Sequence, residues 1–222
     1  GGGLCGRLAV FSGGWTLAAA AAGCGVGDPL AVVSGLVDQS LARLEGTEAE
    51  ARYDMLDVVR EYASERLREA GEWGSTARRH ALYHLELAEE GELNLVGAGQ
   101  EEWSRTLDLE RGNLRRSLAW ALAETDNAPA LRFTVALWRY WRHTGQFAEG
   151  RRWSEAALAL HGIAPASLRA KALWATAFLA YPQGDYRRLA GLAGEGLEAA
   201  RKRGDPMDLR KALTAPGQAA VC

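Results

Sequence analysis

Cysteine is scarce in this chain, and the cysteines that occur lie far apart. Cys5, Cys24 and Cys222 are odd in number, and no Cys-x-x-Cys pair is present. These spacings exclude a disulfide framework and a zinc ribbon, and they favour a reducing compartment. We therefore expect a cytoplasmic protein that is stabilised by a hydrophobic core, for which a hydrophobic fraction of 48% is sufficient.

The chain also lacks the motifs of several enzyme classes. It contains no Gly-x-x-x-x-Gly-Lys-[Ser/Thr] loop to cradle nucleotide phosphates and no Gly-x-Ser-x-Gly nucleophile elbow. No uninterrupted apolar run reaches the roughly 18 residues that a membrane span requires. We therefore predict neither an enzyme nor a membrane protein, and we expect no catalytic residue and no bound cofactor in this segment.

Histidine is rare as well, but two of the four histidines are close in sequence. His80 and His84 would lie on one face of a helix, a spacing that can bind zinc. The glutamate of the His-Glu-x-x-His signature does not follow His80, and His143 and His161 are isolated. The sequence therefore predicts no metal site, and we expect both paired histidines at the surface or at a domain boundary.

Residues 52–62, Arg-Tyr-Asp-Met-Leu-Asp-Val-Val-Arg-Glu-Tyr, carry the most informative local pattern. The alternation of Tyr53 and Met55 indicates a strand, with which residues 41–44 can pair across a polar connector. Asp57 is expected to cap the following helix, because its carboxylate can accept bonds from unpaired backbone N–H groups. The pattern predicts a β-hairpin that leads directly into a helix, on which Arg60 is expected to be solvated.

Three helical segments precede this hairpin. The first ends near Phe11, Thr16 can cap the second, and Asp28 followed by proline favours the start of the third. Three helices, a hairpin and a last helix are the element order of a winged-helix domain. We assign this domain to residues 1–72, with Gly71 as the expected C-cap of the last helix.

From residue 73 onward the pattern is almost wholly helical. Gly145-Gln-Phe147 and Gly184-Asp-Tyr186 are equivalent segments about 39 residues apart, and each follows an apolar helix. Such turns between paired helices are typical of a tetratricopeptide-like solenoid, in which neighbouring pairs bury each other's apolar faces. We therefore predict a mainly α fold, with α-helical tetratricopeptide-like repeats in residues 73–222. Large contacts between helices are expected from the tryptophans at positions 103, 120, 138, 141, 153 and 174.

Several blocks carry a family resemblance. Residues 55–63, Met-Leu-Asp-Val-Val-Arg-Glu-Tyr-Ala, resemble the Met-His-Asp motif and following helix that end the nucleotide-binding module of STAND-class (NB-ARC/AP-ATPase-like) signalling ATPases. The subgroup is that of the large bacterial ATP-dependent transcriptional regulators of LuxR and SARP type. Further blocks resemble it in the same order, at residues 7–16, 36–41, 138–141 and 149–153. The resemblance covers most of residues 7–205.

The resemblance implies a regulatory and interaction segment, truncated at both ends, of a longer signal-transducing protein. ATP or ADP would bind to an upstream P-loop ATPase module, onto which the winged helix docks, and the repeats would sense an unidentified protein or small-molecule inducer. In that family the histidine of the motif senses the phosphate of ADP and the aspartate braces the helix start. Met55 and Asp57 match this motif, whereas Leu56 replaces the histidine and has no donor for a phosphate. Met55, Leu56 and Asp57 are the candidate cofactor-binding residues of this degenerate motif.

Direct DNA binding by the expected winged helix is disfavoured by its charge. The net charge of the chain is −2, and residues 8–42 contain neither Lys nor Arg. The helix that would read DNA has Asp28 and Asp38 instead, although nonspecific affinity requires several contacts between cations and phosphates. We therefore expect DNA to be bound only through a domain outside this chain.

Two other contexts are compatible with the same residues. The module could belong to a signalling protein with an adenylyl cyclase or kinase domain, or it could be a free-standing repeat scaffold without an ATPase. The residues of this chain do not separate these alternatives, because the discriminating domain would lie elsewhere in the polypeptide.

Overall fold

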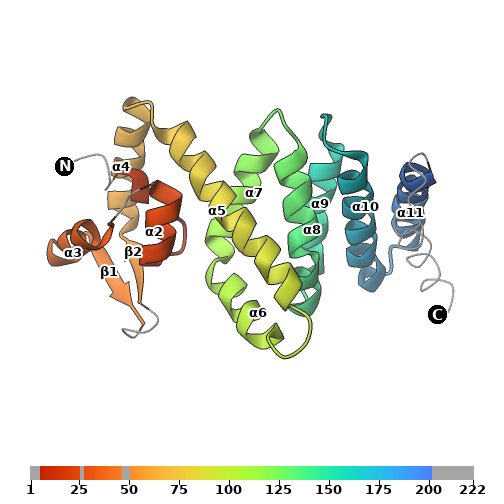
Figure 1. Cartoon of the computed structure of the whole chain (residues 1–222), viewed down its shortest axis with the longest axis horizontal. Helices are drawn as coiled ribbons and strands as arrows, with labels where there is room; N and C mark the ends of the chain where they lie inside the picture. Colours follow the sequence, from red (N-terminus) through yellow and green to blue (C-terminus); the bar gives the residue numbers. More distant parts are fainter. Residues whose placement is uncertain (1–5, 26–27, 47–50, 202–222) are drawn as a thin grey trace. The chain divides into compact units, whose positions relative to one another are not determined.

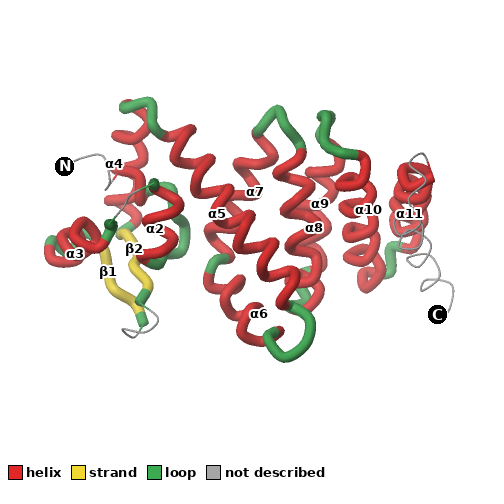
Figure 2. Tube along the Cα trace, viewed as in Figure 1, coloured by secondary structure: helices red, strands yellow, loops and turns green. Residues whose placement is uncertain are grey.

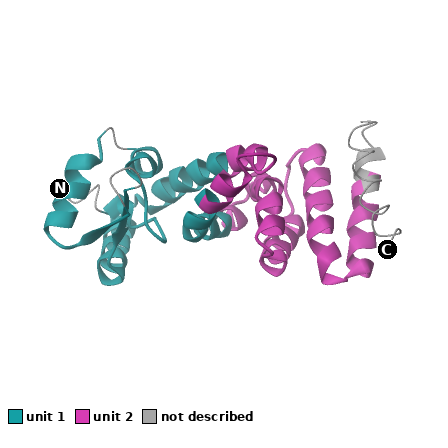
Figure 3. Ribbon diagram, turned by 90° about the horizontal axis from the view of Figure 1, so that it is seen from below, with its two compact units in different colours: residues 1–87, 106–120 teal, residues 88–105, 121–222 magenta. Residues whose placement is uncertain are grey.

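The computed structural model of the chain describes residues 6–25, 28–46 and 51–201. The chain divides into two compact units, which Figure 3 shows in different colours. Unit 1 comprises residues 1–87 and 106–120, and unit 2 comprises residues 88–105 and 121–222. Helices dominate both units, as the sequence predicts, and the described strands form one small sheet (Figure 2).

Unit 1 begins with a short helical turn at residues 6–8. The elements that follow, labelled in Figure 1, are α2 (Leu17–Cys24), α3 (Leu30–Asp38), β1 (Ala42–Glu45), β2 (Arg52–Met55) and α4 (Asp57–Glu69). Parts of α5 (Trp73–Asn94), α6 (Gln100–Leu109) and α7 (Arg111–Ala123) complete this unit.

The predicted hairpin is confirmed. β1 and β2 pair antiparallel, with Ala42 opposite Met55 and Leu44 opposite Tyr53. A third extended segment, at Trp15, was not predicted from the sequence. Trp15 forms a bridge with Tyr53 in which each backbone N–H donates to the other's carbonyl oxygen over 2.8 Å. This bridge ties the chain before α2 to the hairpin.

The helix ends of unit 1 agree only partly with the sequence. Thr16 caps α2 as predicted, because its Oγ1 accepts a hydrogen bond of 3.1 Å from the backbone N–H of Ala19. α2 ends at Cys24 and is followed by Gly25 in a left-handed conformation, and α3 begins at Leu30 with Pro29, not Asp28, in the N-cap position. Gly71, with a φ of 70°, follows the end of α4 as expected.

The core of unit 1 contains aromatic and aliphatic side chains from segments that are far apart in sequence. Its largest fully buried members include Phe11, Trp15, Leu8 and Met55. The rings of Phe11 and Trp15 lie 5.7 Å apart. Met55 therefore anchors the end of β2 in the core, immediately before the start of α4.

Unit 2 consists of packed helices. After the parts of α5 and α6 that belong to it come α8 (Ala128–His143), α9 (Phe147–Ala159), α10 (Ala166–Ala180), the 3-10 turn η2 (Tyr181–Gln183) and α11 (Tyr186–Arg201). α8 contacts α9 and α10, and α10 also contacts α9 and α11. Gly145 and Gly184 both have positive φ angles and lie in the turns before α9 and α11, where the sequence predicts turns.

Three tryptophans of unit 2, Trp138, Trp141 and Trp174, make the large contacts between helices that the sequence predicts. Trp138 and Trp141 of α8 are buried, and the ring of Trp138 meets that of Trp174 edge to face at 4.8 Å. α9 approaches Trp141 so closely that a Cβ on Gly150 would lie 2.6 Å from the indole. Trp103, Trp153 and Trp174 are only partly buried, and so is Trp120, which belongs to unit 1.

Candidate functional site at the junction of β2 and α4

The structure brings Met55, Leu56 and Asp57 together at the junction between β2 and α4, where they differ sharply in exposure. Met55 is buried, Leu56 is partly buried, and the side chain of Asp57 is 94% exposed. The prediction that Asp57 caps α4 is wrong. Leu56 holds the N-cap position without a side-chain bond, and Asp57 is the first helical residue. There its carboxylate still favours the helix, because it lies at the positive end of the helix dipole.

Arg60 stabilises this junction through hydrogen bonds. Its Nη2 donates to the Asp54 carboxylate and to the carbonyl oxygen of Met55, each over 2.7 Å, and its Nη1 donates to Asp57 over 2.6 Å. Only 17% of the Arg60 side chain is exposed, so the expectation of a solvated arginine is wrong. The sequence did not reveal this role, because Asp54 and Met55 reach Arg60 only once the strand turns into the helix. The Arg60 guanidinium therefore pairs with two carboxylates, those of Asp54 and Asp57.

A groove runs along the face of α4 that follows this junction. It has a volume of about 740 Å³ and is lined mainly by apolar side chains, those of Leu41, Val58, Val59, Tyr62, Ala63, Leu67 and Ala70, with Gly6, Arg66 and Glu72. Val58 is 79% exposed and Tyr62 is 62% exposed, and the guanidinium of Arg66 lies 5.6 Å from the centre of the Tyr62 ring. Large apolar side chains exposed side by side are typical of an interaction surface.

Unit 1 also contains a buried polar network centred on Glu110. Arg52 donates to its carboxylate, as does the amide of Asn113, over 2.6 Å. His84 Nε2 lies 3.4 Å from Glu110 Oε2, the oxygen that accepts from Asn113. Burial alone would raise the pKa of Glu110, but the neighbouring His84 ring and the bonded Arg52 guanidinium outweigh burial and lower this pKa to about 2. Glu110 is therefore ionised throughout the physiological range.

The two paired histidines belong to this network, and their expected place at the surface is wrong. Both are fully buried. His80 Nε2 lies 3.3 Å from Asn113 Oδ1, and His84 Nδ1 donates to the carbonyl oxygen of His80 over 2.7 Å. Burial, followed by the neighbouring His84, lowers the pKa of His80 well below its usual value. Across the described residues, no group of three His, Cys, Asp or Glu side chains has a geometry suited to a metal ion.

Asn113 and Arg116 connect α7 to the segment before α2. Asn113 Oδ1 accepts from the Ser12 backbone N–H over 2.7 Å, and Arg116 Nη1 donates to the carbonyl oxygens of residues 9, 10 and 11. A Cβ on Gly112 would lie 2.2 Å from the Ser12 carbonyl oxygen, so only glycine permits this approach. Sequence reasoning missed this network, because its partners lie far apart in the chain, by 33 residues for His80 and Asn113 and by 107 for Arg116 and Ala9. We interpret it as structural, since its polar groups are directed at one another.

The remaining sequence-based expectations concern reactivity and location. Cys24 is buried, and burial raises the pKa of its thiol to about 12, so the thiolate is suppressed. Cys5 and Cys222 lie outside the described residues. In the described part of the chain, no helix combines the length and hydropathy that crossing a bilayer would require.

Comparison with curated proteins gives a consistent set of relatives. The chain is 34% identical over 226 aligned residues to "Putative HTH-type transcriptional regulator Mb0914c" of Mycobacterium bovis. It is equally similar to the proteins of the same description, MT0914 and Rv0890c, from two Mycobacterium tuberculosis strains. The alignment includes 95% of this chain but 25% of each relative, so the chain spans about a quarter of their length. No family model and no solved structure matches the chain.

Proposed function

We propose that this chain is a regulatory and interaction segment of an ATP-dependent transcriptional regulator that acts in the cytoplasm. The names of the relatives support a role in transcriptional regulation, because they describe HTH-type regulators. The order of α2, α3, the hairpin and α4 supports a winged-helix interpretation of unit 1. The paired helices of unit 2, with glycine turns at positions 145 and 184, support tetratricopeptide-like repeats that sense a partner or ligand.

The groove on α4 is the observation that carries this proposal. It begins next to Met55, Leu56 and Asp57, the residues of the degenerate nucleotide motif, and it exposes Val58 and Tyr62. Burial of these two side chains would favour association, since each buried apolar side chain contributes roughly 1.5–3 kcal/mol. In our proposal the groove docks onto the P-loop ATPase module of the full-length protein, and ATP or ADP is held by that module. The segment itself is not an enzyme.

In this proposal the residues at the junction of β2 and α4 have different roles. Leu56 has no hydrogen-bond donor on its side chain, so it would pack against the nucleotide module rather than bind phosphate. Arg60 holds Asp54, Met55 and Asp57 in one arrangement, which would keep the docking face rigid. Exchange of the nucleotide would then shift a closed-to-open equilibrium, provided that the two states make different contacts with α4.

Substitutions on α4 of the full-length protein test the docking. We expect Val58→Glu and Tyr62→Glu to release the ATPase module, lower the nucleotide retained on purification and change basal reporter transcription. Asp57→Ala is expected to shift the same two readouts, because it changes the motif at the edge of the groove. Glu65→Gln is the matched control, since Glu65 is exposed on the same helix and does not line the groove. Unchanged nucleotide retention and unchanged transcription in all three variants would refute the proposal.

DNA binding is proposed for the part of the protein outside this chain. α3 carries no Lys or Arg, and Asp28 and Asp38 lie at its two ends. Fluorescence anisotropy of a labelled duplex is expected to show no binding by this chain at 0.15 M salt, whereas the full-length protein binds. Tight, salt-sensitive binding by the chain itself would contradict this assignment.

A further inference from the structure

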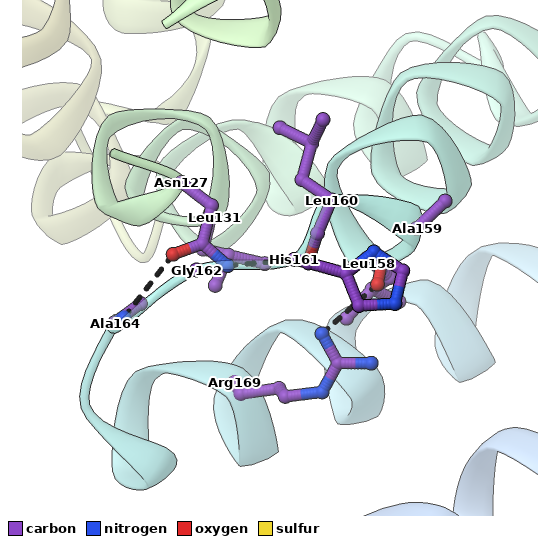
Figure 4. Close-up of a pocket in the computed structure, with 9 residues that line it drawn as sticks. All are labelled: Asn127, Leu131, Leu158, Ala159, Leu160, His161, Gly162, Ala164 and Arg169. Carbon is purple, nitrogen blue, oxygen red and sulfur yellow. Dashed lines mark hydrogen bonds between the residues drawn. The ribbon is translucent and has the colours of Figure 1, made fainter. Parts of the chain in front are cut away.

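Unit 2 contains a pocket beside the connection from α9 to α10. It has a volume of about 310 Å³ and lies between the start of α8, the connection from α9 to α10, and α10 itself (Figure 4). Its lining consists of Asn127, Leu131, Leu158, Ala159, Leu160, His161, Gly162, Ala164 and Arg169. A volume of this size suits a small organic molecule, at the lower end of the range for ligand pockets.

The wall of this pocket is held in place by a buried amide. Asn127 is only 3% exposed, and its Oδ1 accepts from the backbone N–H of Ala164 over 3.1 Å. Its Nδ2 donates to the carbonyl oxygen of Leu160 over 3.4 Å. A Cβ on Gly162 would lie 2.3 Å from Asn127 Oδ1, so the chain passes close over the amide because position 162 is glycine. Asn127 therefore holds the connection at two points, at Leu160 and at Ala164.

Arg169 provides the charge of the pocket. Its Nη1 donates to the carbonyl oxygen of Leu158 over 2.9 Å, at the end of α9. This bond fixes the side chain but uses one of the five N–H donors of a guanidinium, so the others can serve a ligand. His161 is the other ionisable residue of the lining, which contains no Asp or Glu. The pocket thus has a positive wall that no lining carboxylate neutralises.

Leucine and alanine side chains form the apolar part of the lining. Leu131 and Leu158 are buried, and Leu160 and Ala164 lie beside them in the lining. Figure 4 shows the Arg169 guanidinium directed toward the carbonyl oxygen of Leu158. An apolar wall beside an arginine fits a ligand with an apolar body and one anionic group, because arginine pairs with a carboxylate through two parallel hydrogen bonds.

From these observations we propose that the pocket binds a small organic acid, whose carboxylate pairs with Arg169 and whose hydrocarbon body packs against Leu131 and Leu158. This inference deepens the proposed function, since it names a ligand class for the sensing role of unit 2. It rests on that function only for the regulatory consequence of binding. The binding itself is a property of this chain and is measured on it directly.

The probes are straight-chain carboxylates of four to ten carbons, titrated into the 222-residue chain and followed by calorimetry and by the backbone amide resonances of Gly162 and Ala164. We expect one chain length, such as hexanoate or octanoate, to bind best and to shift these resonances. The neutral amide of the same acid is expected to bind at least about tenfold more weakly, because it loses the charge-assisted bonds. Absence of binding by every acid up to millimolar concentration would overturn the proposal.

Matched variants separate pairing with Arg169 from general attraction to a cation. Arg169→Gln is expected to weaken binding of the best acid about tenfold or more, and Arg169→Lys by a smaller factor, because lysine keeps the charge but not the planar fork. Arg187→Gln on α11, which removes an exposed arginine outside the pocket, is expected to leave the affinity unchanged. Circular dichroism establishes that each variant is folded before it is titrated.

Equal affinity in the Arg169→Gln and wild-type chains would refute the assignment of Arg169. If the Arg169 variant and the Arg187 variant both weaken binding equally, the acids bind through general charge and the pocket proposal also fails. Neither result changes the expectation for the Val58 and Tyr62 variants, which test docking in the full-length protein. The two proposals can therefore fail independently.

Discussion

The side-chain amide of Asn113 donates a hydrogen bond of 2.9 Å to the carbonyl oxygen of Gly14, ninety-nine positions earlier in the chain. Asn113 also accepts from the Ser12 N–H and donates to Glu110, so one buried side chain joins the loop before α2 to the start of α7. Buried polar groups cost free energy unless they are paired. The stability of unit 1 should therefore depend strongly on this residue.

Replacement of Asn113 tests this dependence. We expect Asn113→Ala to lower the free energy of unfolding by about 3 kcal/mol, because several buried partners lose their hydrogen bonds at once. Urea denaturation followed by circular dichroism measures the change. Asn94→Ala is the control, since Asn94 is exposed and its amide bonds only one helix carbonyl, that of Glu90. A loss for Asn113→Ala no larger than for the control would contradict the structural role of the network.

Two glycines of unit 2 should respond in opposite directions to alanine. Gly150→Ala places a Cβ 2.6 Å from the Trp141 indole and is expected to destabilise the chain by about 1–3 kcal/mol. Gly191 lies within α11 with open space around its Cα, so Gly191→Ala should stabilise by up to about 1 kcal/mol, since alanine favours a helix. Thermal unfolding measures both. A Gly150→Ala variant that is at least as stable as the wild type would mean that α8 and α9 do not approach as described.

The depressed pKa of His80 predicts a dependence of stability on pH. In the unfolded chain this histidine takes up a proton near its usual pKa of 6.5, whereas in the folded chain it stays neutral to a lower pH. The unfolded state then binds more protons, so stability decreases as the pH falls below 6.5. Between pH 7 and pH 5 we therefore expect a loss of stability that is attributable to this residue.

Glu110 adds to this acid sensitivity at lower pH. Its folded pKa of about 2 lies below its usual 4.5, so its contribution is present above pH 4.5 and is lost as the pH falls toward 2. His80→Gln isolates the histidine part, because it should flatten the curve between pH 7 and pH 5. His161→Gln, which changes an exposed histidine, should retain the wild-type curve. Parallel curves for wild type and His80→Gln would show that His80 does not resist protonation in the fold.

Arg60 should matter more to stability than its position on a charged helix suggests. Arg60→Met leaves the carbonyl oxygen of Met55 and the Asp54 carboxylate without this donor, and we expect a loss of about 1–3 kcal/mol. Arg66→Met, the same substitution on the same helix, removes an exposed pair with Glu69 and should change stability by less than about 0.5 kcal/mol. Chemical denaturation of both variants makes the comparison. Equal effects would mean that the junction is not held by Arg60.

Local features of this protein followed from its sequence because they depend on neighbouring residues. The Thr16 cap, the antiparallel pairing within residues 41–56 and the turns at Gly145 and Gly184 involve short-range geometry, and each is present in the structure. Capping and turn preferences act within a few residues, so a sequence pattern can carry them. The cap at Asp57 failed within the same range, because Arg60 takes up the carboxylate that was expected to bond the backbone.

The burial of His80 and His84 had no such local signal. Their partners, Asn113 and Glu110, approach only when α7 packs beside residues 12–14, and glycine at position 112 permits that approach. The pocket beside Arg169 likewise requires the amide of Asn127 to hold a connection more than thirty residues away. These partners are chosen by packing, which sequence spacing does not encode.

The sequence by itself determined the helical character of this protein, its hairpin and the turns between its helices. Backbone preferences and hydrophobic periodicity depend on short stretches of residues, so a local pattern predicts them. Only the tertiary structure decided which charges are neutralised, which histidines are buried, and where an apolar groove and a positively charged pocket are left open. The reason is that desolvation and pairing depend on distances in space, and residues far apart in the chain set those distances.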